Sequence, residues 1–259
     1  MCSCSPVDAP GVRDTLHAVR GLLNRDDPFA ICTVVDGPLD VGRSVIVGTQ
    51  GVLAASTGPQ GLDDDVTRLA GACLTSRVSR LHTLDSRLVF ADVLAPPPRL
   101  VVCGAGDDSR PLVVYASDSG YAVTVVDHRA AFLSSDRFPA ARRLVALRPE
   151  DDPAALGIDP DTAVVIQTHS FAHDREWLRH VLRTDASYIG LLGPRARMDQ
   201  ILRQIGAQDS RRVYGPVGLD LGAEGPEQIA ISIVAELLAV RADTRPKHLR
   251  GRGAAIHAF

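Results

Sequence analysis

The chain has 259 residues, of which 45% are hydrophobic and 23% are charged, and its formal net charge is -3 at pH 7. This is ordinary globular composition, with enough apolar residues for one large domain or two modest ones. The weak negative charge offers no bulk attraction for a polyanion, so we expect no nucleic-acid partner. No apolar run approaches the roughly 20 residues of a membrane span, and the first residues do not resemble a secretion signal. We therefore expect a cytoplasmic protein.

The first 95 residues are typical of a small α+β domain. Apolar residues at helical spacing predict two helices, over residues 12–23 and 62–74. Short apolar or β-branched runs, broken by glycine, predict strands at residues 29–35, 44–47, 52–55 and 88–94. The segment 96–99 then contains three successive prolines, which favour an extended, stiff linker over a helix or a central strand.

Strand and helix signals alternate from residue 100 to residue 259. The predicted strands are residues 100–103, 122–126, 143–147, 163–167, 188–192 and 212–214. The predicted helices follow the first strand to about residue 120 and then cover residues 174–182, 197–205 and 226–240. Such alternation implies a parallel sheet with helices on both faces. The fold class is therefore α/β, a Rossmann-like domain preceded by the small α+β domain.

Five cysteines are spread along the chain, at positions 2, 4, 32, 73 and 103. Their number is odd and their spacing irregular, so we expect no disulfide framework. Cys32 and Cys103 lie in strand-like apolar runs, where a buried thiol behaves as a small hydrophobic side chain. Cys2 and Cys4 form a C-x-C pair without a second pair of ligands nearby, and we expect no metal site there.

The turn after the first Rossmann strand contains the start of a dinucleotide-binding motif. Gly104 permits a tight turn, and Gly106 allows the backbone to approach a pyrophosphate. The third small residue of the motif is Ser109, and Asp127 ends the next predicted strand about twenty residues further on. An acid there accepts hydrogen bonds from ribose hydroxyls. The alternative is a turn that merely needs glycine, with Asp127 as a solvated strand end.

Asp107 and Asp108 are unusual next to this turn. They place two negative charges beside a helix N-terminus where a pyrophosphate would lie. Three interpretations remain open from the residues alone. The two acids cap the helix, they hold a metal that bridges to phosphate, or they argue against ordinary NAD binding.

Two later turns have the same strand-to-helix form. Gly193 frees the first turn, and Arg195 and Arg197 offer positive charge to a phosphate or carboxylate. The second turn contains three glycines with Asp220 and Glu224, two carboxylates that are suited to a metal, a sugar hydroxyl or a proton in transfer. Solvated arginines in the first turn, and acids that serve only a helix N-terminus in the second, are the alternatives.

His169 follows the fourth predicted strand, where a Rossmann sheet presents side chains to its ligand. His173 and Asp174 come one turn later, so a metal held by the three is one interpretation. We favour a histidine that contacts ligand or caps the helix without a metal, since no other strong ligand is adjacent. The chain contains no G-x-S-x-G, H-E-x-x-H or Walker lysine, which argues against hydrolase and P-loop functions.

Taken together, these segments resemble the XdhC/CoxI family, accessory proteins of molybdenum hydroxylases. The resemblance rests on five motifs in order, at residues 104–108, 123–129, 168–174, 188–195 and 218–224. The tail at Gly251-Arg252-Gly253 and Ile256-His257 also resembles the family's terminal segment. The family's smaller domain usually carries a Gly-Gly-Cys segment. The corresponding stretch here, residues 53–59, has no cysteine, which places a sulfur-transfer role in question.

The resemblance implies a protein that binds molybdenum cofactor, as molybdopterin or its dinucleotide form, assists its sulfuration and inserts it into an enzyme. The implied partner is a molybdenum hydroxylase apoenzyme resembling xanthine or CO dehydrogenase, with a cysteine desulfurase and a second copy of the chain as further partners. Expected cofactor-binding residues are Gly104, Gly106, Asp107, Asp127, His128, Arg129, His169, Gly193, Arg195, Asp220 and Glu224. The rival hypotheses are an NAD(P)-binding oxidoreductase, a degenerate nucleotide-binding member of the family, and a scaffold whose glycine loops are empty turns.

Overall fold

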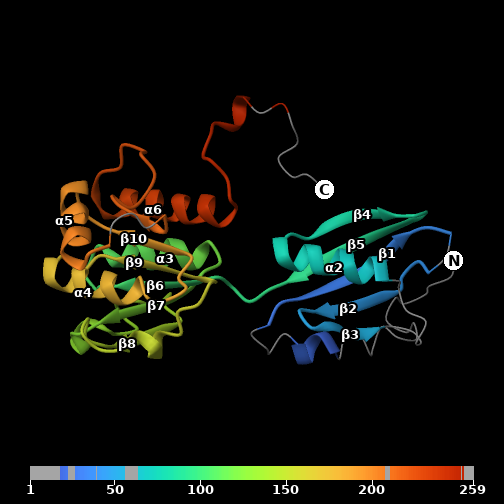
Figure 1. Cartoon of the computed structure of the whole chain (residues 1–259), viewed down its shortest axis with the longest axis horizontal. Coiled ribbons are helices and arrows are strands. Elements are labelled where there is room, and N and C mark those ends of the chain that lie inside the picture. The colour runs from blue at the N-terminus through green and yellow to red at the C-terminus, as the bar shows by residue number, and fades with distance from the viewer. Residues whose placement is uncertain are drawn as a thin grey trace. The chain divides into compact units, whose positions relative to one another are not determined.

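The computed structural model divides the chain into two compact units, with the boundary between Pro96 and Pro97 (Figure 1). The second unit runs from Pro97 to Arg250. The residues that the structure describes are 18–22, 27–38, 40–55, 64–207, 211–251 and 253. The C-x-C pair, residues 56–59 of the stretch compared with Gly-Gly-Cys, and most of the terminal tail lie outside these ranges.

The first unit contains a five-stranded antiparallel sheet in the order β3-β2-β1-β5-β4, with one long helix packed against it. The elements are β1 (Phe29–Asp36), β2 (Ser44–Gly48), β3 (Gly51–Ala55), α2 (Asp64–Ser76), β4 (Arg80–Leu84) and β5 (Arg87–Leu94). Val66, Ala70 and Cys73 of α2 pack with Cys32 and the other buried residues of the sheet. Residues 18–22 are helical, and the rest of the helix predicted over 12–23 lies outside the described residues.

Strand β4 was not predicted from the sequence. Its residues, Arg-Leu-His-Thr-Leu, are mostly exposed, and the strand pairs only with β5 at one edge of the sheet. A short turn joins the two strands, with Asp85 in the left-handed region at a φ of 51°. An edge strand with so little burial lacks the apolar run that marks a strand in sequence.

The second unit contains a six-stranded parallel sheet in the order β11-β10-β9-β6-β7-β8. Its elements are β6 (Arg99–Cys103), α3 (Ser109–Asp118), β7 (Ala122–Asp127), β8 (Arg143–Ala146), β9 (Thr162–Ile166), α4 (Phe171–Val181), β10 (Tyr188–Leu191), α5 (Arg195–Ile205), β11 (Val213–Tyr214) and α6 (Gly225–Arg241). The short 3-10 helices η1 (Ala130–Phe132) and η2 (Pro153–Leu156) lie within it, and a third, η3 (Leu249–Gly251), begins at its end. This order is that of the Rossmann fold, and the direction of winding reverses between β6 and β9.

Helices cover both faces of the parallel sheet, as its short and wholly buried strands β9 and β10 require (Figure 1). Leu100 and Val102 of β6 pack on the face covered by α3 and α6. Val101 and Cys103 alternate with them and pack under α4 and α5. The carboxyl ends of β6, β7 and β9 therefore meet at one edge, where Rossmann domains bind ligands. None of the helices in the described part of the chain has the length and apolarity to cross a membrane.

A carboxylate on α6 ties three parts of this unit together. Glu236 Oε2 accepts a hydrogen bond from the Tyr188 hydroxyl of β10 at 2.5 Å and another from the Gly218 N–H at 2.9 Å. Tyr188 also stacks on Tyr214, with 4.5 Å between the ring centroids. Burial and the bond to Glu236 raise the pKa of Tyr188, so its hydroxyl stays a donor. The loop before α6 is thereby fixed to the sheet.

We expect Glu236→Leu to lower the free energy of unfolding by about 1–3 kcal/mol for each donor left without a partner. Glu236→Gln keeps an acceptor oxygen in the same place and serves as the matched control, with a loss well below that of the leucine variant. Urea unfolding followed by circular dichroism measures both. Equal losses in the two variants would show that the bonds from Tyr188 and Gly218 do not contribute.

Candidate functional site

In the glycine loop after β6, residues 104–108, the absence of a Cβ on two glycines lets neighbouring atoms approach the backbone closely. Gly104 has a φ of 122°, and a Cβ there would lie 2.6 Å from the carbonyl oxygen of Gln167. A Cβ on Gly106 would lie 2.7 Å from Asp108 Oδ1. Within the described ranges, the N–H groups of Gly106, Asp107 and Asp108 have no hydrogen-bond partner. These three donors at the start of α3 are free for an anion.

Ser109, the third small residue of the motif, does more than fill space. Its buried hydroxyl donates to the Gly104 carbonyl oxygen at 2.8 Å and accepts a hydrogen bond from Gln167 Nε2 at 2.7 Å. The glycine loop is therefore fixed to the end of β9 as well as to β6. Gln167 was not predicted as a site residue. A polar residue that ends an apolar strand was the signal available for it.

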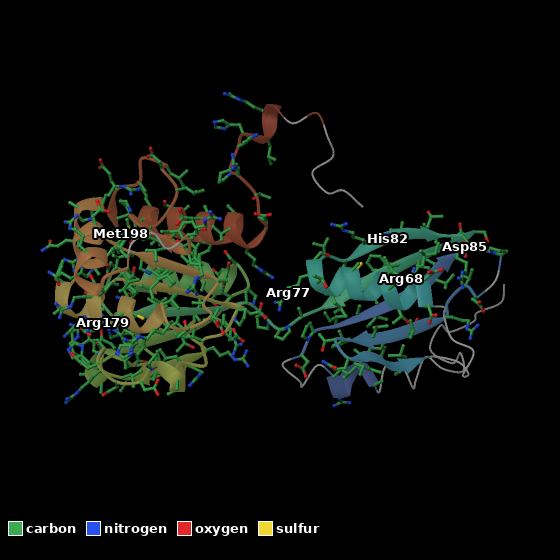
Figure 2. The ribbon with its side chains drawn as sticks, viewed as in Figure 1. Arg68, Arg77, His82, Asp85, Arg179 and Met198 are labelled. Carbon is green, nitrogen blue, oxygen red and sulfur yellow. The ribbon has the colours of Figure 1, made fainter. Side chains whose placement is uncertain are left out.

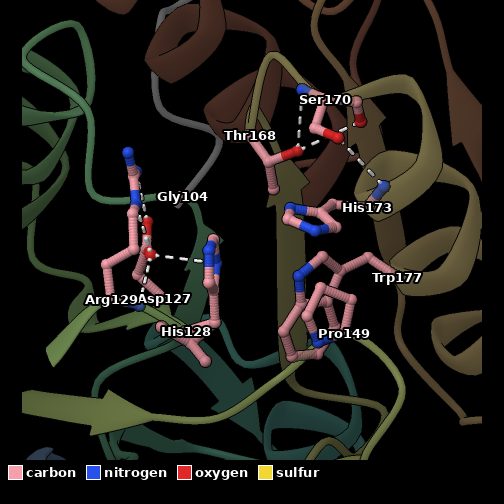
Figure 3. A pocket seen from close by; sticks show the side chains of 10 residues that line it. Gly104, Asp127, His128, Arg129, Pro149, Thr168, Ser170, His173 and Trp177 are labelled. Atoms are coloured by element: carbon pink, nitrogen blue, oxygen red, sulfur yellow. Dashed lines mark hydrogen bonds and ion pairs between the residues drawn. The ribbon is translucent and has the colours of Figure 1, made fainter.

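Asp127 fixes the other side of the glycine loop through a bond to Ala105, and its carboxylate lies beside Arg129 and His128 (Figure 3). It is only 4% exposed at the end of β7. Oδ2 accepts hydrogen bonds from the Ala105 N–H and from an Arg129 guanidinium nitrogen, both at 2.8 Å. Oδ1 accepts from the Arg129 N–H at 2.8 Å and from Arg129 Nε at 3.0 Å, and His128 Nδ1 lies 3.3 Å away. A carboxylate has about four acceptor positions, and those of Asp127 are filled by the protein itself.

This geometry differs from the expectation that Asp127 accepts ribose hydroxyls. A ribose would have to displace Arg129 or the glycine loop to reach the carboxylate. Burial alone would raise the pKa of Asp127, but the hydrogen bonds from Arg129 and Ala105 outweigh it and lower the pKa to about 2. Asp127 therefore remains ionised and acts on the loop, while Arg129, with its guanidinium 4.1 Å from the centre of the Phe132 ring, faces outward.

Both acids of the glycine loop, Asp107 and Asp108, are paired with cationic or ionisable groups. Asp107 is 3.0 Å from an Arg137 guanidinium nitrogen that also donates to the Ala105 carbonyl oxygen at 3.2 Å. Asp108 Oδ2 is 2.6 Å from His169 Nε2. Asp108 makes no side-chain cap bond to α3, which excludes the capping interpretation for it. Arg137 was missed from the sequence because residues 133–142 carry no helix or strand pattern.

Two cavities lie beside the glycine loop. The first, here called the histidine pocket, has a volume of about 190 Å³ (Figure 3). It is lined by Gly104, Val126, Asp127, His128, Arg129, Pro149, Thr168, Ser170, His173 and Trp177. The rings of His128 and His173 meet edge to face, with 4.7 Å between their centroids. The pocket is smaller than the roughly 300–1,000 Å³ of a complete ligand site, and suits one flat group of a larger ligand.

The second cavity, here called the apolar pocket, has a volume of about 230 Å³. It is lined by Asp108, Gln167, His169, Leu192, Gly225, Pro226, Ile229 and Ala230. The segment after β9 separates the two pockets, because its residues alternate between them. Gln167 and His169 line the apolar pocket, whereas Thr168 and Ser170 line the histidine pocket. A group bound on the glycine loop would thus have a cavity on either side.

The remaining expected site residues are less closely gathered. Arg195 is exposed at the start of α5, and Asp220 and Glu224 are exposed in the loop before α6. Their neighbours Leu192 and Gly225 line the apolar pocket, but they themselves do not. Gly193 has a φ of 126°, and its missing Cβ leaves room for Arg197 at 3.0 Å. None of these four residues lines either of the two cavities.

Arg197, expected to bind a phosphate or carboxylate, and Asp174, considered as a metal ligand, form an ion pair with each other. Asp174 is 1% exposed and lies 2.5 Å from an Arg197 guanidinium nitrogen. It also accepts hydrogen bonds from the Thr168 hydroxyl at 2.6 Å and the Thr168 N–H at 3.1 Å. Arg197 is therefore not free to bind a phosphate. In the described residues, no group of three or more His, Cys, Asp or Glu side chains is placed to hold a metal ion.

The model of the XdhC Rossmann domain matches residues 100–237, more than half of the chain. The chain belongs to the XdhC family. It is 39% identical over 160 residues to a probable xanthine dehydrogenase subunit of Bacillus subtilis, covering 62% of this chain and 48% of that protein. It is 30% identical over 240 residues to the uncharacterised protein YqeB of Escherichia coli, covering 83% and 44% of the two chains. This XdhC chain thus spans less than half the length of either relative.

A crystal structure described as a xanthine dehydrogenase of Bacillus halodurans has a similar fold. Its TM-score with this XdhC chain is 0.56, at 23% sequence identity, over 86% of this chain and 92% of the other. The similarity extends beyond residues 100–237. At this level of identity it supports the fold alone.

Because Asp127 is buried and ionised, we expect the free energy of unfolding to depend on its protonation at acid pH. Because the pKa of Asp127 is lower in the folded protein than its ordinary value of 3.8, the carboxylate stabilises the folded state at any pH above about 4. This contribution is lost as the pH falls from about 4 to 2. The shift corresponds to about 2 kcal/mol. Asp127→Asn should lose this amount at pH 7 and show a flatter dependence of stability on acid pH. Urea unfolding from pH 2 to pH 7 measures it, and parallel curves for the two proteins would contradict the structural role.

Proposed function

We propose that this chain binds molybdenum cofactor and delivers it to a molybdenum hydroxylase related to xanthine dehydrogenase. Membership of the XdhC family and the name of the Bacillus subtilis relative support the class of partner. The observation that carries the binding role is the glycine loop, with three unpaired N–H groups between two cavities. The phosphate of the cofactor would lie on these donors, as anions do at helix N-termini.

The charges around the loop fit such a ligand. Two acids beside a phosphate site would repel it, but Asp107 is paired with Arg137 and Asp108 with His169. Arg129 adds a guanidinium that is 41% exposed near the histidine pocket. The free N–H groups and the positive end of α3 add an attraction for a phosphate. The guanidinium beside Asp107 reduces the repulsion from these acids, whereas His169 does so for Asp108 only when its imidazole is protonated.

The protein's own part in this function is to bind, orient and shield. The cofactor itself supplies the molybdenum and pterin chemistry when bound. Gly104 and Gly106 allow close approach of the phosphate, and the two pockets enclose the groups on either side of it. The glycine loop is held from two directions, by Asp127 and by Ser109 with Gln167, so binding requires little reordering of the backbone.

The described cysteines do not favour sulfur transfer by this chain. Burial raises the pKa of Cys32 to about 12 and raises that of Cys103 well above its usual value. Cys73 Sγ lies 3.9 Å from Nε2 of His82, the residue labelled on β4 in Figure 2, but burial raises its pKa as well. Because the thiolate is the sulfur nucleophile, these thiols are poorly suited to that step. We therefore place binding and delivery at the centre of the proposal.

Gly106→Val tests the phosphate site. The added side chain would cover the free N–H groups. The backbone of Gly106 is not in the left-handed region, so the substitution requires only that the Asp108 carboxylate, whose Oδ1 would lie 2.7 Å from the new Cβ, moves aside. We expect affinity for molybdenum cofactor released from a purified molybdenum hydroxylase to fall at least about tenfold, with little change in thermal unfolding. Gly71→Val in α2, where an added Cβ meets nothing, is the control. Unchanged affinity in Gly106→Val would exclude the glycine loop as the phosphate site.

The ligand that co-purifies with the chain from its own host provides the direct test of the proposed function. Mass spectrometry should detect a molybdopterin or its dinucleotide. NAD or NADP in its place would support the oxidoreductase alternative.

Replacing Cys73 by alanine tests the role of the thiols. We expect binding of molybdenum cofactor and activation of the partner apoenzyme to remain within about twofold of the unmodified protein, because a buried thiol with a raised pKa is not a working nucleophile. Activation is measured as the activity of reconstituted partner. If activation is lost while binding persists and the fold is intact, Cys73 carries sulfur after all.

A further inference from the structure

The guanidinium of Arg137 reaches the glycine loop from the segment between β7 and β8. One terminal nitrogen, Nη2, donates to the Ala105 carbonyl oxygen at 3.2 Å and to Asp107 Oδ1 at 3.0 Å. Both contacts use this same nitrogen. Within the described ranges, Nη1 and Nε make no hydrogen bond, and Nε is buried from solvent. Because a guanidinium has five N–H donors, most of the donors of Arg137 are left unpaired.

Arg137 is the fixed member of its pair with Asp107. The next residue, Phe138, is buried in the core of the Rossmann unit. The Arg137 guanidinium carbon lies 5.0 Å from the ring centre of Phe132 and 5.8 Å from that of Phe138, within the range of cation–π attraction. These rings and the carbonyl oxygen of Ala105 hold the guanidinium beside the glycine loop without any help from Asp107.

Asp107 is the replaceable member of the pair. Its side chain is 81% exposed, and Arg137 is the only partner of its carboxylate in the described part of the chain. An ion pair with so exposed a carboxylate contributes little to stability, because water solvates the separated carboxylate nearly as well. Separation of Asp107 from Arg137 therefore costs little once another anion takes its place.

The Asp107 carboxylate takes up a position that a phosphate oxygen of a ligand would suit. It places an anionic oxygen on a guanidinium nitrogen at the loop where three backbone N–H groups are unpaired. A phosphate has more acceptor oxygens than a carboxylate, so it could accept from the guanidinium and from these N–H groups together. Arginine is well suited to such recognition, because its planar fork of donors matches phosphate oxygens. The incompletely paired guanidinium is thus evidence for an anion here that does not depend on the start of α3.

We propose that Arg137 binds the phosphate of the cofactor, and that Asp107 occupies the guanidinium only until the phosphate displaces it. This inference rests on the proposed function and adds a binding residue and a competitor to it. On binding, the Asp107 carboxylate leaves Nη2 and turns to solvent, while the bond from Nη2 to the Ala105 carbonyl oxygen remains. A ligand without a phosphate leaves the pair intact, so the pair also selects for phosphorylated ligands. Asp107 therefore opposes binding in this arrangement, in contrast to the binding role expected for it from the resemblance.

The affinity of matched variants for two probes tests this competition. The probes are molybdenum cofactor released from a purified molybdenum hydroxylase, and inorganic pyrophosphate, which supplies the anion alone. Arg137→Gln removes the guanidinium charge, and Asp107→Asn removes the competing charge. Asp136→Asn makes the same change at an exposed residue next to Arg137 in the sequence and is the control. A double variant, Arg137→Gln with Asp107→Asn, shows whether the two effects are coupled.

We expect Arg137→Gln to weaken binding of both probes at least about tenfold, because a charge-assisted hydrogen bond is lost. Asp107→Asn should strengthen binding of both about threefold or more, because the phosphate no longer has to displace a carboxylate. Asp136→Asn should change neither affinity. In the double variant, Asp107→Asn should bring no gain over Arg137→Gln alone, because the competition takes place on the guanidinium.

Three results would each contradict the inference: weaker binding in Asp107→Asn, unchanged affinity in Arg137→Gln, or a gain from Asp107→Asn that persists without Arg137. If the unmodified protein binds molybdenum cofactor and one of these results is found, only this inference fails. If it binds pyrophosphate but no molybdenum cofactor, the proposed function fails, and the variants still decide the role of Arg137. If it binds neither probe, both fail. Should Arg137→Gln not fold, the change in Asp107→Asn relative to Asp136→Asn decides.

Discussion

The carboxylate of Asp127 holds together the parts of the molecule from which a ligand site can be built. It comes from the end of β7, binds the backbone of the glycine loop after β6, and grips the guanidinium of Arg129 with both oxygens. Arg129 in turn lies over Phe132 in the segment that leads to β8. A single buried charge therefore sets the position of the loop, of an outward-facing cation and of the first turn beyond the strand. Each hydrogen bond helps to offset the cost of burying that charge.

The same rule of local pairing extends across the carboxyl edge of the parallel sheet. Four aspartates lie there, and each has its own cationic or ionisable partner, in the pairs Asp107–Arg137, Asp108–His169, Asp127–Arg129 and Asp174–Arg197. The carboxylates of Asp107, Asp127 and Asp174 each have a guanidinium nitrogen within 3.0 Å that offsets their repulsion of an anionic ligand. The unpaired N–H groups of the glycine loop add an attraction that a phosphate would meet.

The sequence was sufficient to predict the Rossmann unit because its strands are short, apolar and separated by glycine turns and amphipathic helices. The glycines of the first turn and the acid that ends β7 were also recognisable by spacing. Their partners were not. Arg137 lies in a segment without periodicity, Gln167 acts through one long-range hydrogen bond, and Arg197 turned out to pair with Asp174 across 23 residues. Spacing identifies candidate groups, but the pairing of charges is a property of the folded chain.

The segment 167–170 forms a wall whose successive side chains serve opposite pockets. Inserting or deleting one residue there would exchange the two linings, so that Gln167 and His169 would face the side now served by Thr168 and Ser170. Changes of identity at one position would affect one pocket only. In homologues that keep both pockets, the number of residues in this connection should therefore vary less than their identities. The constraint acts on which residues face which pocket, and each individual residue is free to change.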